Sequence, residues 1–122
     1  MPTTYNSTLQ KAHLAAIEPD VHGRISKRTA ALDGVSVTEV TFGVGARWSE
    51  DLKDYAGTAS CLLPHVSLVL SGTLRVLADD GSTEDFSGGD VMLLPPGHDA
   101  WTVGEEPAVF VEFSRGNDYY AS

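Results

Sequence analysis

The chain has 122 residues, 42% hydrophobic and 20% charged, which predicts one globular domain with its own core. Its longest apolar runs are only a few residues, which excludes a transmembrane helix, and its formal net charge of −9 argues against nucleic acid or an anionic membrane as a partner. The single cysteine, Cys61, cannot form an intramolecular disulfide and fits a reducing compartment, so we expect a cytoplasmic protein.

The negative charge is concentrated in the second half of the chain. Residues 1–75 carry seven Lys or Arg and seven Asp or Glu, whereas residues 76–114 carry nine acids and no Lys or Arg. The simplest use of this charge is solubility.

The first element in chain order is an N-terminal arm over residues 1–30, which are weakly patterned. Residues 8–17 fit either a short helix, ended near Pro19, or an extended segment. Residues 35–42 are rich in β-branched side chains between an Asp-Gly pair and Gly43, and this predicts a strand. Residues 51–58 are polar and predict a loop.

Residues 65–71 alternate between polar and apolar side chains, which predicts a strand with a polar face. That face meets solvent in an ordinary sandwich, and in a barrel it equally well lines the interior. Gly72 then bends the chain into the next strand.

Further strands recur at short intervals with Gly-rich or Asp-rich turns between them, and this predicts an all-β sandwich or barrel. The Asp-Gly pair at 80–81 is a strong hairpin signal. The remaining expected strands are 73–78, 83–86, 91–94, 101–103 and 108–113. We expect the barrel to span residues 31–115, followed by a tail at residues 116–122.

Residues 89–101 form the most specific stretch of the chain. A Gly-Asp turn leads into four apolar residues, and the Pro-Pro-Gly breaker that follows must end the strand. His98 is thereby placed at the exit of a strand.

Between Gly45 and Trp101 the sequence resembles the cupin superfamily of small β-barrels. Residues 65–72 are similar to the second half of the first cupin motif, and residues 89–98 to the second motif. The resemblance implies an all-β, cupin-type double-stranded β-helix, a jelly-roll barrel. The chain further resembles a bacterial group of single-domain cupins whose members mostly lack an assigned activity.

The usual cupin metal ligands, three histidines and a glutamate, are not all present. His65 falls at the position of the glutamate, and the positions of the paired histidines hold Ala59 and Cys61, or Thr58 and Ser60 with the longer spacing. In the second motif Ala100 occupies the usual histidine position, because His98 follows the glycine directly.

The resemblance implies that His65 and His98 line one cavity, where they are candidate catalytic residues and metal ligands. Two imidazoles and a third ligand bind divalent Zn, Fe, Mn or Ni. Alternation along the strand makes Cys61 the candidate third ligand, with Glu50 and Asp99 as weaker ones. In the competing interpretations Cys61 is a small buried apolar residue, and the histidines work as an acid–base pair without metal.

The remaining candidates are substrate-binding residues near the mouth of the barrel. Trp48 and Trp101 are candidate aromatic walls, although packing in the core or at a dimer interface explains them equally well. Arg47 is a candidate for holding a substrate carboxylate, the alternative being a surface ion pair. Tyr55 completes this set.

The sequence thus predicts a small-molecule enzyme, catalysing an isomerase, lyase, cyclase or dioxygenase step, because these are the activities that the cupin resemblance implies. The alternative is a non-catalytic ligand-binding or regulatory barrel without metal. We expect a homodimer, since cupins often dimerise.

Overall fold

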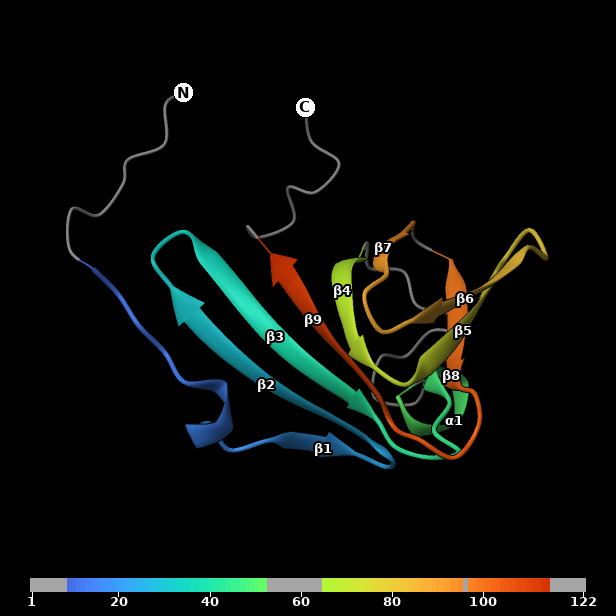
Figure 1. Cartoon of the computed structure of the whole chain (residues 1–122), viewed down its shortest axis with the longest axis horizontal. Coiled ribbons are helices and arrows are strands. Elements are labelled where there is room, and N and C mark those ends of the chain that lie inside the picture. The colour runs from blue at the N-terminus through green and yellow to red at the C-terminus, as the bar shows by residue number, and fades with distance from the viewer. Residues whose placement is uncertain (1–8, 53–64, 96, 115–122) are drawn as a thin grey trace, which may run out of the picture.

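Two antiparallel β-sheets make up most of the computed structural model, which describes residues 9–52, 65–95 and 97–114, with His65 and Ser114 described by their backbone alone (Figure 1). One sheet has six strands in the order β1-β2-β3-β9-β4-β7, and the other has three in the order β6-β5-β8. The strands are β1 (Asp20–His22), β2 (Ile25–Leu32), β3 (Val35–Phe42), β4 (His65–Ser71), β5 (Thr73–Ala78), β6 (Thr83–Ser87), β7 (Val91–Leu94), β8 (His98–Thr102) and β9 (Ala108–Ser114).

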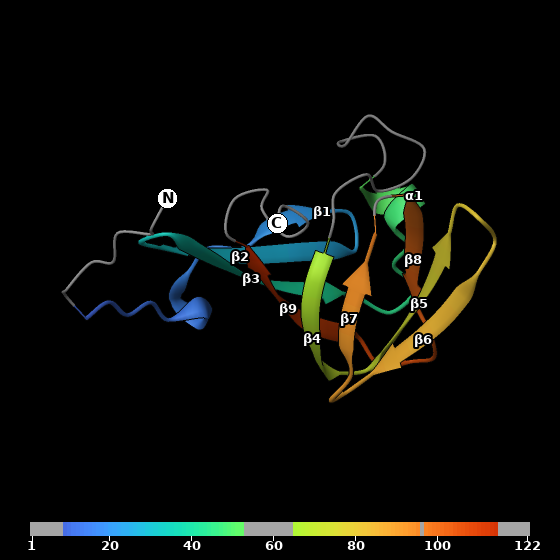
Figure 2. The same ribbon diagram turned by 90° about the horizontal axis from the view of Figure 1, so that it is seen from above.

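Seen from above, β9, β4 and β7 form one side of a barrel, and β5, β6 and β8 form the other (Figure 2). The expected all-β barrel is therefore confirmed. Within the described residues, no helix combines the length and hydropathy needed to span a bilayer.

The core lies between the two sheets and is built from the inward residues of both. Phe42 of β3 and Phe110 of β9 meet there with their ring centroids 5.7 Å apart. Burying each such side chain contributes about 1.5–3 kcal/mol. The buried cluster contains Ile25, Val40, Phe42, Ala46, Trp48, Leu52, Val69, Leu74, Val76, Met92, Leu94, Ala100, Ala108 and Phe110.

The strand β4 turns polar Ser67 inward and apolar Leu70 outward. Ser67 and Val69 are each 1% exposed, whereas Leu70 is 50% exposed. Ser67 belongs to the polar set of the alternation in residues 65–71, and this member of the set faces the interior, not solvent.

The N-terminal region differs from the expected arm. A boundary at residue 30 falls inside β2, which pairs along its whole length with β3, so residues 20–30 belong to the sheet. Before them the described chain contains one short 3-10 helix, η1 (Leu14–Ala16), and Arg28 Nε of β2 donates a hydrogen bond to Ile17 O at 3.0 Å. The strand was missed because its polar and apolar residues do not alternate.

The chain passes from one sheet to the other at Gly72, between β4 and β5. Gly72 has φ +72°, and a Cβ added there would collide with the backbone oxygen of Pro107. Both the left-handed conformation and the close approach therefore require glycine.

We expect Gly72→Ala to lower the free energy of unfolding in urea by about 3 kcal/mol or more, because strain and collision add. Gly81→Ala is the matched control: Gly81 also has positive φ, at +90°, but nothing lies within 4 Å of the added Cβ. That variant should lose only about 1–2 kcal/mol. Equal losses would contradict the role assigned to the Pro107 contact.

The helix α1 (Trp48–Asp51) is tied to the turn between β1 and β2 by the Asp51 carboxylate. Asp51 accepts hydrogen bonds from Arg47 N at 2.9 Å, Arg24 N at 3.2 Å and Arg24 Nε at 3.2 Å. Burial raises the pKa of Asp51, but these N–H groups and the Arg24 charge together lower it more, so the net pKa lies below its usual value.

A group with a lowered pKa in the folded state stabilises the fold above its unfolded pKa, and this contribution is lost as the pH falls through the folded value. We therefore expect Asp51→Asn to lower the free energy of unfolding at pH 7 by about 1–3 kcal/mol. Below about pH 4 the difference between variant and wild type should shrink. Glu105→Gln, in an exposed loop, is the control and should leave the free energy of unfolding at pH 7 close to that of the wild type.

Candidate functional site

His98 is the first residue of β8 and points into the barrel. Along β8 the side chains of His98, Ala100 and Thr102 are buried, whereas Asp99 and Trp101 on the opposite face are only partly buried. His98 as a whole is 4% exposed. The strand begins three residues earlier than the sequence predicts, so His98 is part of β8 and not of the loop before it.

The orientation of the His98 ring is set by the breaker that precedes β8. Nδ1 lies 2.9 Å from Pro95 O. A carbonyl oxygen only accepts hydrogen bonds, so Nδ1 is the protonated nitrogen in this arrangement. In the neutral imidazole the lone pair is then on Nε2.

His98 lines a groove of about 620 Å³ at one end of the barrel. Its walls come from the ends of β5 and β7, from the β5–β6 hairpin and from the segment between β7 and β8. The lining residues are Val76, Ala78, Asp79, Asp80, Ser82, Thr83, Glu84, Phe86, Leu93, Leu94, Pro95, Gly97 and His98. The groove is therefore largely apolar with three carboxylates, and no Lys or Arg is among its described lining residues.

Two walls of this groove are joined through their backbones. Asp79 N donates a hydrogen bond to Gly97 O at 2.8 Å. Gly97 has φ +88°, and a Cβ there would lie 2.6 Å from Asp79 Oδ2. Glycine at this position therefore allows the β5–β6 hairpin to approach the segment that presents His98.

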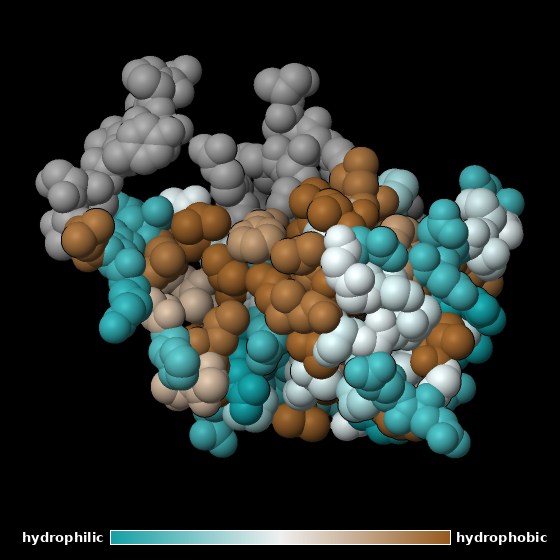
Figure 3. Space-filling model, in the orientation of Figure 1, coloured by the Kyte–Doolittle hydropathy of each residue, from teal (hydrophilic) through white to brown (hydrophobic). Residues whose placement is uncertain are grey.

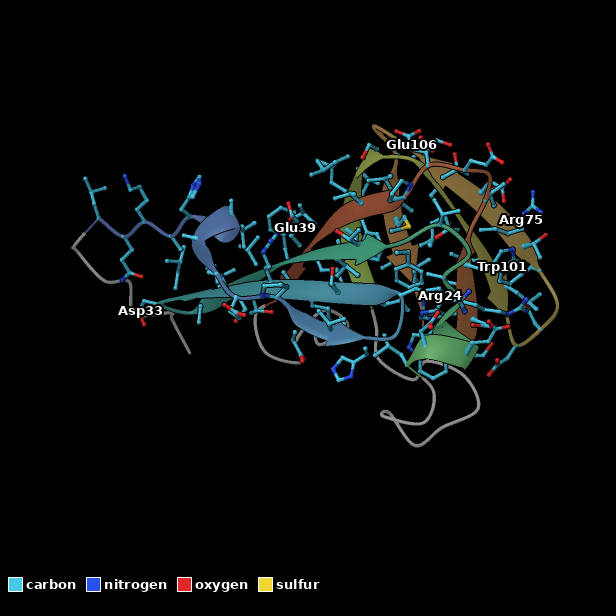
Figure 4. All side chains as sticks on the ribbon, turned by 90° about the horizontal axis from the view of Figure 1, so that it is seen from below. Arg24, Asp33, Glu39, Arg75, Trp101 and Glu106 are labelled. Carbon is cyan, nitrogen blue, oxygen red and sulfur yellow. The ribbon has the colours of Figure 1, made fainter. Side chains whose placement is uncertain are left out.

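Arg47, Asp99 and Trp101 form a cluster on the outer face of β8, away from His98. Arg47 Nε donates to Asp99 Oδ2 at 3.0 Å, and Ser49 N donates to Asp99 Oδ1 at 3.0 Å. The guanidinium carbon of Arg47 lies 4.2 Å from the Trp101 ring centroid. Figure 4 shows Trp101 and its register partner Arg75 on the outer side of the three-stranded sheet.

The prediction that Arg47 and Trp101 bind substrate beside His98 does not agree with this placement. Neighbouring strand residues point to opposite faces, so Trp101 and His98 cannot line one cavity. Asp99 likewise points outward, where it binds Arg47 and α1 and does not orient His98.

Two other candidates also lie outside the groove. Trp48 is 7% exposed and belongs to the core, so packing explains it. The Glu50 side chain is 60% exposed and accepts a hydrogen bond from Arg24 Nη2 at 2.7 Å, which makes it unsuitable as an interior metal ligand. Tyr55 and Cys61 lie outside the described residues.

No protein-family profile matches the sequence, and no curated protein does. Solved structures do match. The polyketide cyclase RemF from Streptomyces resistomycificus has a TM-score of 0.66 at 16% identity, covering 87% of this chain and 78% of its own. KdgF from Halomonas sp. has a TM-score of 0.66 at 19% identity, covering 91% and 97%. An RmlC-like cupin from Shewanella frigidimarina has a TM-score of 0.62 at 18% identity, covering 87% and 89%.

The chain has the cupin fold. The agreement extends over most of its length, and it confirms the resemblance that the two motifs indicate. At these identities the similarity establishes the barrel, and the chemistry has to be argued from the residues.

The backbone of His65 lies at the same end of the barrel as the groove. The register of β4 and β7 pairs His65 with Leu94, which lines the groove. Over the described residues, no group of three or more His, Cys, Asp and Glu is arranged to hold a metal ion. A metal site with three such ligands would therefore need side chains that are not among the described ones. The predicted ligands His65 and Cys61 are of this kind.

Ser67 is an interior residue that the site prediction omitted, although the alternation of residues 65–71 included it in the polar set. Its Oγ is buried and has no hydrogen-bond partner among the described groups. Buried hydroxyls are nearly always bonded, so Ser67 is a candidate contact for a ligand or water inside the barrel. Its register partners are Met92 and Glu112.

We expect Ser67→Ala to change the free energy of unfolding of the ligand-free protein by less than about 0.5 kcal/mol, because no hydrogen bond to a described group is lost. The comparison is Thr102→Val, which removes a buried hydroxyl that donates to Phe42 O and Gly43 O. That change should cost about 1–3 kcal/mol. Equal losses in urea unfolding would show that the Ser67 hydroxyl is bonded in the ligand-free protein.

Proposed function

We propose that this cupin is an enzyme acting on a small organic molecule bound in the groove beside His98. The reaction class we favour is an isomerase, lyase or cyclase step, in which a proton moves at the substrate. The observation that carries the proposal is the buried His98 ring in the lining of the groove, oriented by the bond from Nδ1 to Pro95 O.

The lining of the groove indicates the kind of substrate. A volume of about 620 Å³ lies within the usual range for small-molecule sites. Apolar side chains would pack against the body of the molecule, and the carboxylates of Asp79, Asp80 and Glu84 would repel an anion. Arg47, the expected partner of a substrate carboxylate, is bonded to Asp99 on the other face of β8. The substrate we propose is therefore uncharged or cationic.

One solved structure of similar fold agrees with this reaction class. RemF is described as a polyketide cyclase, and its fold matches this chain over 87% of the residues. A polyketide is a largely apolar molecule, so a groove of this composition would suit such a ligand. The likeness supports the class of substrate and not its identity.

The proposal includes a divalent metal bound by His98 Nε2, with His65 and Cys61 as the other ligands. A bond from the second imidazole nitrogen to a carbonyl is typical of metal-ligating histidines, so His98 suits this role. Imidazole and thiolate together favour Zn²⁺ or Fe²⁺ over harder cations. Such a metal would act as a Lewis acid on a substrate carbonyl.

The test is elemental analysis of protein purified without an affinity tag. We expect about one metal per chain in the wild type, and its loss in His98→Ala, His65→Ala and Cys61→Ser. His22→Ala is the control, because His22 lies on β1 outside the barrel and bonds to Asp20, and it should retain the metal.

If the wild type takes up none of Zn²⁺, Fe²⁺, Mn²⁺ or Ni²⁺, the metal part of the proposal is wrong. Retention by Cys61→Ser alone would remove only the thiolate from the ligand set. Retention by His98→Ala would remove the residue on which the proposed site depends.

A further inference from the structure

The outer face of the three-stranded sheet carries Arg47 and Trp101, which the groove does not use. Trp101 of β8 lies opposite Arg75 of β5, and Arg75 lies opposite Asp85 of β6. Directly opposed residues point to the same side of a sheet. Beyond β8, Arg47 is bridged to Trp101. Adjacent segments therefore contribute one line of side chains, the outer row, which runs Asp85, Arg75, Trp101, Arg47.

A depression of about 530 Å³ lies beside the outer row, and this volume is usual for a small-molecule site. Its described lining residues are Arg75, Thr83, Glu84, Asp85 and Trp101. Arg47 is not among them, so the part of the indole that borders the depression differs from the part that the Arg47 guanidinium covers. The Glu84 side chain is on the groove side of β6, because its register partner Val76 is buried inside the barrel.

The sheet around the outer row is polar. Thr73 and Ser87 form the next pair along β5 and β6, and their hydroxyl oxygens lie 2.9 Å apart. Figure 3 shows hydrophobic side chains gathered at the middle of the molecule, over β9 and β4, whereas the surface at the β5–β6 hairpin is mostly hydrophilic. A surface of this composition suits a polar small molecule better than an apolar one.

The charges of the outer row are paired. Arg75 Nε donates to Asp85 Oδ1 at 2.7 Å, and Arg75 Nη2 donates to Asp85 Oδ2 at 2.9 Å. Arg47 is bonded to Asp99. The two arginines and the two aspartates together carry no net charge. An anion or a cation would have to displace one partner of a pair in order to bind, so the outer row favours a neutral ligand.

The paired side chains still have hydrogen-bonding capacity for such a ligand. The bonds to Asp85 use only part of the N–H groups of the Arg75 guanidinium, and each carboxylate oxygen keeps a further lone pair. Both side chains are accessible, with exposed fractions of 43% and 42%. The Arg75 hydrogen bond also lowers the pKa of Asp85, so this acceptor stays ionised at neutral pH.

The indole of Trp101 adds an apolar surface to these donors and acceptors. Its orientation is supported by the Arg47 guanidinium, whose carbon lies 4.2 Å from the ring centroid. A pyranose ring has the matching chemistry, because it combines an apolar face of C–H groups with a rim of hydroxyls that both donate and accept hydrogen bonds.

We infer that the outer row binds a neutral carbohydrate, with one sugar ring against Trp101 and hydroxyls bonded to Arg75 and Asp85. Since Trp101 and His98 are on opposite faces of β8, this site is separate from the groove and goes beyond the proposed function. From Asp85 to Trp101 the row crosses two strand spacings, roughly 10 Å. An extended β-1,4-linked chain repeats over a similar length.

Isothermal titration calorimetry of the untagged full chain with cellotetraose and mannotetraose tests this inference. We expect binding with a Kd of roughly 0.1–5 mM, because the depression is open and polar. Trp101→Ala and Arg75→Ala, on different strands, should each weaken binding by roughly ten-fold or more, since they remove the stacking surface and the donors. Arg28→Ala is the matched control: Arg28 pairs with Glu39 on the other sheet, and this variant should bind like the wild type.

Two further comparisons establish where and what the protein binds. His98→Ala should bind cellotetraose like the wild type, and loss of binding in this variant would place the sugar in the groove and overturn the inference. Tetramannuronate is the β-1,4-linked analogue of mannotetraose with a carboxylate on each ring. It should bind about ten-fold more weakly or worse, because the protein carries a net charge of −9. Equal or tighter binding of tetramannuronate would overturn the assignment of a neutral ligand.

Far-UV circular dichroism establishes that each variant is folded. If neither neutral tetrasaccharide binds the wild type at concentrations up to about 20 mM, the inference is wrong. Binding that persists unchanged in both Trp101→Ala and Arg75→Ala overturns it as well, since the sugar would then occupy another surface.

Discussion

The period of two along β8 is the constraint on which the candidate site depends. Five consecutive residues serve two sides of a sheet, because neighbouring side chains point in opposite directions. The inner side presents His98 to the groove and anchors Thr102 to backbone carbonyls, while the outer side holds Asp99 and Trp101 against Arg47. A shift of register by one residue would exchange the two sets, so the packing on both faces specifies where the imidazole lies.

Backbone contacts at one end of the barrel complete this positioning. His98 is bonded to Pro95 O, and Gly97 O is bonded to Asp79 N of the neighbouring hairpin. Each bond contributes only about 0.5–1.5 kcal/mol, but together they fix the ring on rigid elements, as a functional side chain requires. The β5–β6 hairpin also supplies the carboxylates of the groove. The same hairpin therefore supports the segment that carries His98 and gives the groove its negative charge.

Strand content could be predicted from the sequence because alternation and Gly-Asp turns are local signals. The expected strands at residues 35–42, 73–78 and 91–94 have the bounds that the structure gives them. The strand β2 was missed because its pairing with β3, and not its own pattern, makes it extended. The motifs place His98 at the pocket, but they cannot place Arg47 or Trp101, because these two side chains are fixed by contact with each other and, for Arg47, with Asp99, which is distant in sequence.

The stacking of Arg47 on Trp101 also means that tryptophan fluorescence can report on β8. The chain has two tryptophans, of which Trp48 is buried in the core and Trp101 is partly exposed under a guanidinium. An aqueous quencher reaches the second indole more readily than the first, so the two emissions can be separated. Because Trp101 is on the reverse side of the strand that begins with His98, any displacement of β8 that accompanies events in the groove alters the environment of a native fluorophore. The barrel thus contains its own spectroscopic reporter, and no attached dye is needed.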